Sequence, residues 1–127
     1  MKTIMIVEDD EQLARALEDF LTNNGYLTVT AKNSDDFFQS ITQDVKVILL
    51  DINLPGKLDG FGILREIRKI DSEARQTPVI VLTNEGDIEN MDKAKEMGAQ
   101  DYLIKSNSDL NTLLNVIKNM IGPGNSQ

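Results

Sequence analysis

The residues best suited to chemistry stand directly after short apolar runs of the chain. These residues are Glu8, Asp9, Asp51, Thr83 and Lys105. If the apolar runs are strands of one parallel sheet, their carboxyl ends lie along a single edge, where open α/β folds build their sites. We therefore expect four separate segments of the chain to converge on one site.

Three of these residues are acidic, and together they require a cation. Glu8, Asp9 and Asp51 would repel one another if they were ionised at close range without a compensating positive charge. The chain has no Cys and no His, so thiolate and imidazole ligands are excluded and a metal must bind through oxygen. Mg²⁺ is the hard cation that fits carboxylate, carbonyl and water oxygens, with Mn²⁺ as the alternative.

The same residues favour phosphoryl-transfer chemistry. A carboxylate such as that of Asp51 can attack a phosphoryl group in line, while Mg²⁺ and Lys105 neutralise the charge on that group. The hydroxyl of Thr83 can donate a hydrogen bond to a phosphoryl oxygen. Positioning and electrostatics are sufficient here, because this reaction leaves the protein little covalent chemistry to do.

Each residue taken alone has an ordinary structural interpretation. Asp51 can form a turn at a strand end, Thr83 can continue a β-branched strand, and Lys105 can be a solvated surface charge. Asp10, which precedes the helical pattern that starts near Leu13, is better interpreted as a helix N-cap than as a metal ligand. The shared position of the others after apolar runs is what favours a common site.

Composition restricts the class of protein. The 127 residues suit one domain, and 40% hydrophobic with 27% charged residues is typical of a globular fold. No apolar run approaches the roughly 18 residues of a membrane span and no signal peptide is recognisable, so a cytoplasmic location is expected. The net charge of -8 opposes direct binding to nucleic acid or to an anionic membrane. We expect proteins and cations as partners, and a partner must supply any histidine chemistry.

Five short apolar runs predict strands. The runs 4–7, 47–50 and 79–82 are continuous and rich in β-branched residues, as is typical of strands buried on both faces of a parallel sheet. The run 27–30 alternates and the run 102–104 is short, so both are predicted at or near sheet edges.

Amphipathic stretches between these runs predict five helices. The helical spacing is clearest at 13–21 and 110–121, is present at 63–70, is thin at 88–94 and is weakest at 35–42. The predicted buried stripe of the first helix consists of Leu13, Ala16, Leu17, Phe20 and Leu21. Helix ends are predicted at Gly25, Gly98 and Gly122-Pro123. This alternation predicts an α/β fold: a doubly wound (βα)5 parallel sheet with right-handed crossovers and helices on both faces.

Several motifs of the chain match a known family. They are Val7-Glu8-Asp9, Asp51-Ile52-Asn53-Leu54-Pro55, Asp59-Gly60, Thr83 and Gly98-Ala99-Gln100-Asp101-Tyr102-Leu103-Ile104-Lys105. Over nearly its whole length the sequence resembles the receiver domains of two-component response regulators, and it is similar to the single-domain chemotaxis type. The resemblance implies a flavodoxin-like fold with strand order 2-1-3-4-5. It also implies a receiver domain over residues 1–122, followed by a tail or linker over 123–127.

The resemblance implies roles at the metal site. Asp51 is the phosphoacceptor, and Asp9, Asp51 and the carbonyl of Asn53 hold the metal with help from Glu8. Lys105 contacts the phosphoryl group. The domain is then not an enzyme with a substrate of its own: it takes the phosphoryl group from a histidine kinase or a histidine phosphotransfer protein, catalyses that transfer itself, and dephosphorylates itself.

The resemblance also implies a switch. Thr83 moves toward the phosphoryl group and Tyr102 turns inward behind it, which changes an output face for a downstream protein target or a lost effector domain. That face is formed by the fourth helix, the fifth strand and the fifth helix. Asn53 and Glu85 stand at the positions that tune water's access to the acyl phosphate, and this polar pair implies relatively fast hydrolysis.

The chain departs from the family pattern at three places. Pro55 and Asp59 are separated by one residue more than usual, which predicts a longer loop beside the acceptor. Leu54 stands where Met is commoner, a change of similar volume. Ser106 replaces the usual proline after the lysine. Because a cis bond before a residue other than proline costs roughly 2.5–4 kcal/mol, we predict a trans bond between Lys105 and Ser106.

Three alternative functions are compatible with the predicted fold. A phosphorylation-independent docking domain would keep the fold without the chemistry. A Mg²⁺-dependent phosphohydrolase would carry a second Asp two residues after the nucleophile, where this chain has Asn53. A flavodoxin-like nucleotide- or cofactor-binding module would place a Gly-rich or Ser/Thr-rich loop after the first strand, and the sequence has none there. The complete set of residues favours the receiver interpretation.

Overall fold

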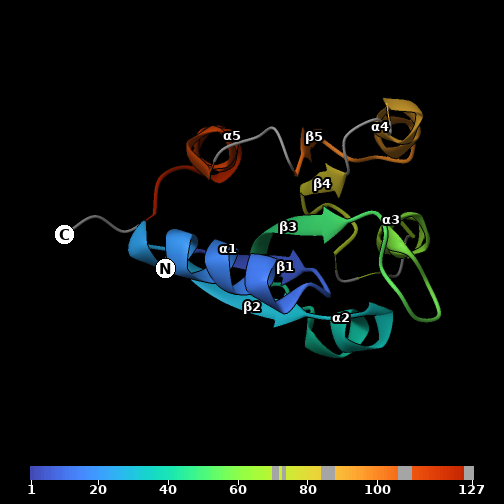
Figure 1. Ribbon diagram of the computed structural model, residues 1–127, viewed down its shortest axis with the longest axis horizontal. Coiled ribbons are helices and arrows are strands. Elements are labelled where there is room, and N and C mark those ends of the chain that lie inside the picture. The colour runs from blue at the N-terminus through green and yellow to red at the C-terminus, as the bar shows by residue number, and fades with distance from the viewer. Residues whose placement is uncertain (70–71, 73, 84–87, 106–109, 125–127) are drawn as a thin grey trace.

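Five parallel strands form one twisted sheet in the computed structural model, which describes residues 1–69, 72, 74–83, 88–105 and 110–124 (Figure 1). The strands are β1 (Thr3–Val7), β2 (Leu27–Ala31), β3 (Val45–Asp51), β4 (Val79–Thr83) and β5 (Asp101–Ile104). Their order across the sheet is β2-β1-β3-β4-β5, and every neighbouring pair is parallel. The predicted strand order is therefore confirmed.

Helices cover both faces of this sheet. Within the described residues they are α1 (Glu11–Asn23), α2 (Ser34–Ser40), α3 (Gly60–Ile67), α4 (Ile88–Glu96) and α5 (Leu110–Ile121). The helices α1 and α5 pack against one face, and α2, α3 and α4 pack against the other (Figure 1). Each face has its own apolar core, as a parallel sheet with helical crossovers requires.

The burial of the strands follows their position in the sheet. The apolar residues of the central runs 4–7, 47–50 and 79–82 are all buried. The outer strand β2 has four of its five residues exposed or partly exposed, and all four residues of β5 are partly exposed. Both edge predictions are confirmed, because an outer strand lacks a neighbour and is covered less completely by the flanking helices.

The predicted helix stripes need one correction. In α1 the buried residues are Ala14, Leu17 and Leu21, whereas Ala16 is exposed. The helix is rotated so that Ala14 faces the sheet, and Leu13 and Phe20 pack at the margin of the core. Because alanine is small and common on both faces of helices, its spacing alone did not distinguish the two positions.

The other helix boundaries lie close to those predicted. α2 begins and ends earlier than the predicted stretch 35–42, since Ile41 already has an extended backbone. α3 ends at Ile67, and the predicted last turn at Ile70 lies outside the described residues. The predicted helix ends are confirmed at three glycines with positive φ, which are Gly25, Gly98 and Gly122.

The helix α4 has a thin apolar stripe, as predicted. Met91 and Ala94 are its buried residues, while the side chain of Ile88 lies outside the described residues. Among the helices that the structure describes, none is long and apolar enough to cross a membrane.

Candidate functional site

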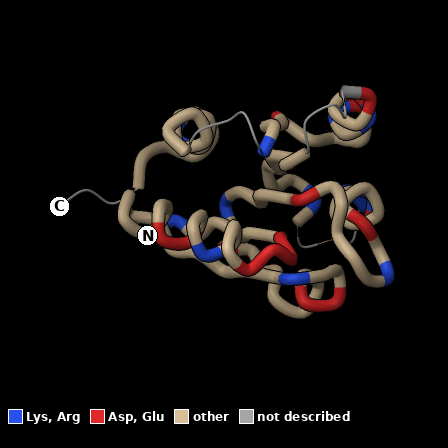
Figure 2. Tube along the Cα trace, viewed as in Figure 1, with Lys and Arg blue, Asp and Glu red and all other residues tan. Residues whose placement is uncertain are grey.

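The predicted site residues meet at the carboxyl edge of the sheet. Glu8 follows β1, Asp51 and Thr83 are the last residues of β3 and β4, and Lys105 follows β5. Figure 2 shows acidic positions gathered at the end of the molecule toward which the strands point. Carboxylate oxygens of Glu8, Asp9 and Asp51 lie within 4.8 Å of one another. Glu8 and Asp51 are buried and Asp9 is exposed, so the cluster opens to solvent on the side of Asp9.

Among the described residues, Lys105 is the cation in direct contact with this cluster. Its Nζ lies 2.9 Å from Glu8 Oε1 and 3.1 Å from Asp51 Oδ2. Its backbone N–H donates to the carbonyl of Thr83 at 2.8 Å, which fixes the start of the lysine side chain at the sheet edge. One ammonium group cannot neutralise three ionised carboxylates. A divalent cation bound through oxygen would complete the charge balance, so the donor set fits Mg²⁺.

Burial and neighbouring charges shift the pKa values of this pair. Burial raises the pKa of Glu8 from 4.5 to about 7, and Asp51 adds to the rise, although the contact with Lys105 opposes it. Burial lowers the pKa of Lys105, but its contacts with Glu8 and Asp51 outweigh burial and raise the pKa overall. Lys105 therefore stays charged across the range in which Glu8 titrates.

The raised pKa of Glu8 predicts a pH dependence of stability in metal-free buffer. The unfolded chain releases the Glu8 proton near pH 4.5 and the folded domain releases it near pH 7. The stability that protonated Glu8 contributes is therefore complete below pH 4.5 and is lost as the pH rises through about 7. The loss amounts to roughly 3 kcal/mol, because one pKa unit corresponds to about 1.4 kcal/mol. Urea unfolding of wild type and Glu8→Gln on both sides of this window measures it. Parallel stability curves for the two proteins would contradict this assignment.

Backbone groups orient two of the acidic side chains. The N–H of Asn53 donates to Asp51 Oδ1 at 3.0 Å, and the N–H of Asp10 donates to Glu8 Oε2 at 3.2 Å. Asp10 itself caps α1, since its Oδ1 accepts from the N–H groups of Gln12 at 3.0 Å and Leu13 at 3.2 Å. The predicted N-cap is confirmed, and Asp10 is not a member of the three-carboxylate group.

Thr83 and Tyr102 lie on adjacent strands. Thr83 is fully buried and is paired in register with Ile104, two residues beyond Tyr102, so Thr83 and Tyr102 project from the same face of the sheet. The ring of Tyr102 is partly buried against the core on that face, and Lys95 Nζ lies 4.9 Å from its centroid. The predicted coupling between the two residues stays a prediction. Glu85 and the bond between Lys105 and Ser106 lie outside the described residues.

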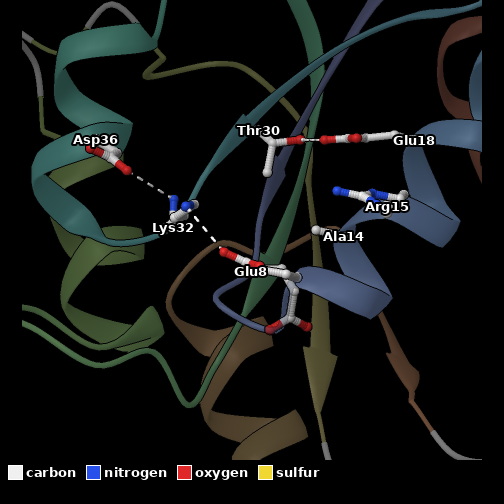
Figure 3. Close-up of a pocket in the computed structure, with 8 residues that line it drawn as sticks. Glu8, Ala14, Arg15, Glu18, Thr30, Lys32 and Asp36 are labelled. Carbon is white, nitrogen blue, oxygen red and sulfur yellow. Dashed lines mark hydrogen bonds and ion pairs between the residues drawn. The ribbon is translucent and has the colours of Figure 1, made fainter.

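A polar pocket of about 270 Å³ adjoins the site between α1 and the junction of β2 with α2. Figure 3 shows its wall, which consists of Glu8, Glu11, Ala14, Arg15, Glu18, Thr30, Lys32 and Asp36. The wall carries both signs of charge. Lys32 pairs with Glu11 at 3.4 Å, and the hydroxyl of Thr30 donates to Glu18. The Lys32–Glu11 pair is exposed and therefore contributes little to stability.

The sequence analysis assigned no role to two residues after the acceptor loop. Asp59 caps α3, and its Oδ1 accepts from the N–H of Gly62 at 2.9 Å. The N–H of Gly60 donates to the carbonyl of Ile52 at 3.0 Å, which joins the start of α3 to the residue after Asp51. An Asp before an apolar periodic stretch is a helix-start signal, so the cap was accessible from sequence, whereas the contact with Ile52 was not.

Comparison with known proteins decides the family. A family model described as the response regulator receiver domain matches residues 4–118. The chain belongs to this family. Receiver domains are signalling domains of two-component systems and interact with histidine kinases and with effector domains.

Relatives of this receiver domain include longer regulators. It is 39% identical over 103 residues to a probable transcriptional regulator, ycf27, of Guillardia theta, covering 80% of this chain and 39% of the relative. It is 37% identical over 106 residues to the transcriptional regulatory protein AfsQ1 of Streptomyces coelicolor, covering 83% of this chain and 45% of the relative. The chain thus spans less than half the length of either relative.

Solved structures agree in fold. A response regulator receiver domain protein from Clostridium thermocellum is 30% identical, with a TM-score of 0.82 over 95% of this chain and 94% of the other. The BeF3-activated receiver domain of RstA from Klebsiella pneumoniae is 29% identical, with a TM-score of 0.82 over 93% of this chain and 97% of the other. The flavodoxin-like receiver fold is therefore confirmed by structure as well as by sequence.

Proposed function

We propose that this receiver domain takes a phosphoryl group onto Asp51 in a Mg²⁺-dependent reaction, with a histidine kinase or a histidine phosphotransfer protein as the donor. An oxygen of Asp51 attacks phosphorus, the bond from phosphorus to the donor's histidine nitrogen breaks, and an aspartyl phosphate forms. The observation that carries this proposal is the convergence of Glu8, Asp9, Asp51 and Lys105 at one sheet edge.

The residues around Asp51 have different roles in this reaction. Glu8, Asp9, Asp51 and the carbonyl of Asn53 would hold Mg²⁺, which supplies charge neutralisation for the phosphoryl oxygens. Lys105 already lies 3.1 Å from Asp51 Oδ2 and so is placed to pair with the phosphoryl group after transfer. The opening on the side of Asp9 admits the donor.

The remaining proposed roles concern signalling. Thr83 hydrogen-bonds the phosphoryl group, and Tyr102 follows its movement, which changes the face formed by α4, β5 and α5 for a protein partner. Asn53 and Glu85 tune hydrolysis of the aspartyl phosphate. The proposed receiver domain covers residues 1–122, and 123–127 are its tail or a linker to an effector domain. The carbonyl of Pro123 accepts from Nζ of Lys2, the residue before β1, at 3.0 Å.

Incubation with acetyl phosphate, followed by intact mass measurement, tests the proposed function. Wild type with Mg²⁺ should gain the mass of one phosphoryl group, and Asp51→Asn should gain none because its side chain cannot act as the nucleophile. Asp36→Asn, which changes an acid outside the three-carboxylate group, should be labelled like wild type. Labelling that survives in Asp51→Asn, or that proceeds equally after Mg²⁺ is chelated, would refute the proposal.

A further inference from the structure

The first turn of α3 lies against the backbone that carries Asp51. A Cβ atom added at Gly60 would stand 2.4 Å from the carbonyl oxygen of Asp51 and 2.5 Å from the Cα of Ile52. Both atoms belong to the main chain, which cannot turn aside as a flexible side chain can. Glycine is therefore the residue that permits this approach of helix to strand.

Hydrogen bonds hold the same short segment on two sides. On one side the N–H of Ile52 donates to the carbonyl of Leu82 in β4 at 3.1 Å. On the other side the carbonyl of Ile52 accepts from the N–H of Gly60 at 3.0 Å. The segment is thus confined between β4 and α3, and it carries the Asp51 carboxylate and the neighbouring carbonyl of Asn53.

We propose that Gly60 is a positioning residue for the reaction at Asp51. Because Gly60 has no side chain, α3 packs closely against the peptide after Asp51. This packing sets the positions of the Asp51 carboxylate and the Asn53 carbonyl. Both positions are defined relative to Glu8 and Asp9. The inference rests on the proposed function, because it concerns the metal and phosphoryl site assigned there. The contacts that carry this inference are with the main chain of Asp51 and Ile52.

The effect of a methyl group at this position can be anticipated from the distances. Ordinary contact of a Cβ begins at 3.4 Å, so Gly60→Ala must displace the helix or the acceptor peptide by about 1 Å. A misplacement of that size costs up to roughly 100-fold in rate at a site that depends on positioning. Intrinsic helix propensity acts in the opposite direction, since alanine favours a helix over glycine.

Gly62 supplies a matched control in the same turn. It is also buried, and an added Cβ would meet the side chain of Leu58 at 3.0 Å rather than the main chain. The nearest atom is Leu58 Cβ, so Leu58 must give by a few tenths of an ångström, whereas the two nearest contacts at Gly60 are at least 0.5 Å closer and are with main-chain atoms of Asp51 and Ile52. Gly62→Ala therefore makes the same chemical change in α3 without pressing on the acceptor segment.

The experiment measures Mg²⁺ affinity by calorimetric titration and the rate of labelling by acetyl phosphate at saturating Mg²⁺, at a temperature where all variants are folded. Gly60→Ala should weaken Mg²⁺ binding by about 10- to 100-fold, as residues that support metal ligands typically do, and should slow labelling. Gly62→Ala should stay near wild type. Values for the two variants within about twofold of each other would overturn the proposal.

A second measurement covers the outcome in which Gly60→Ala does not fold. In wild type, Mg²⁺ should slow hydrogen exchange of the Gly60 amide more than that of the Arg68 amide at the far end of α3, because the Gly60 N–H bonds the carbonyl next to Asp51. Equal slowing at both amides would overturn the proposal. If the wild-type protein neither becomes labelled nor binds Mg²⁺, the proposed function itself is refuted. Failure of the proposed function is thus distinguishable from failure of the inference about Gly60.

Discussion

Replacing Arg68 with methionine is expected to lower the free energy of unfolding by about 3 kcal/mol, because several partly buried acceptors lose a charged donor together. The five N–H groups of the guanidinium make six hydrogen-bond contacts of 2.8–3.3 Å, because one N–H of Nη1 is shared between two carbonyls. Its acceptors are the carbonyls of Ala74, Arg75, Thr77 and Gly98 and the side chain of Gln100. Arg68 thereby joins the end of α3 to the loops that precede β4 and β5.

Thermal unfolding monitored by circular dichroism measures this effect. For a domain of this size the predicted loss corresponds to a decrease in melting temperature of roughly 10 °C. Arg65→Met is the matched control, since Arg65 lies on the same helix with an exposed side chain and should change stability by no more than about 0.5 kcal/mol. Similar decreases in melting temperature for Arg68→Met and Arg65→Met would show that the hydrogen bonds of Arg68 do not account for the predicted stability.

Mg²⁺ is expected to stabilise the domain strongly through the cluster of Glu8, Asp9 and Asp51. The carboxylates lie within 4.8 Å of one another and Lys105 offsets only part of their charge, so the metal-free domain keeps a repulsion that a bound divalent cation removes. A ligand at about 100 times its dissociation constant stabilises by about 2.7 kcal/mol if it binds only the folded state. The melting temperature of wild type should then rise by roughly 10 °C.

Two neighbouring variants test this assignment of ligands. Asp9→Ala removes one carboxylate of the cluster and should lose most of the Mg²⁺-dependent shift. Asp10→Asn retains a good helix N-cap and lies outside the cluster, so it should keep the full shift. Equal shifts in wild type and Asp9→Ala would count against Asp9 as a ligand, and loss of the shift in Asp10→Asn would move the site toward α1.

Local pattern determined the order of elements and the edge that carries the site. The continuous apolar runs 4–7, 47–50 and 79–82 predicted buried central strands, because strands covered on both faces by helices have no solvent-exposed side. Parallel strands bring their carboxyl ends together, so the position of Asp51 or Lys105 after a run was sufficient to predict convergence. Each of these inferences uses residues that are close together in the sequence.

Contacts between distant segments were decided only by the tertiary structure. The sequence did not show that Lys105 bridges Glu8 and Asp51. It did not show that Gly60 packs against the Asp51 peptide. It also did not show that Arg68 donates hydrogen bonds to main-chain carbonyls of two loops. The rotation of α1 that buries Ala14 also depended on the sheet beneath it. The physical reason is common to all of them: a side chain's partner, burial and pKa depend on atoms that other segments bring within a few ångströms, and apolar periodicity carries no information about those distances.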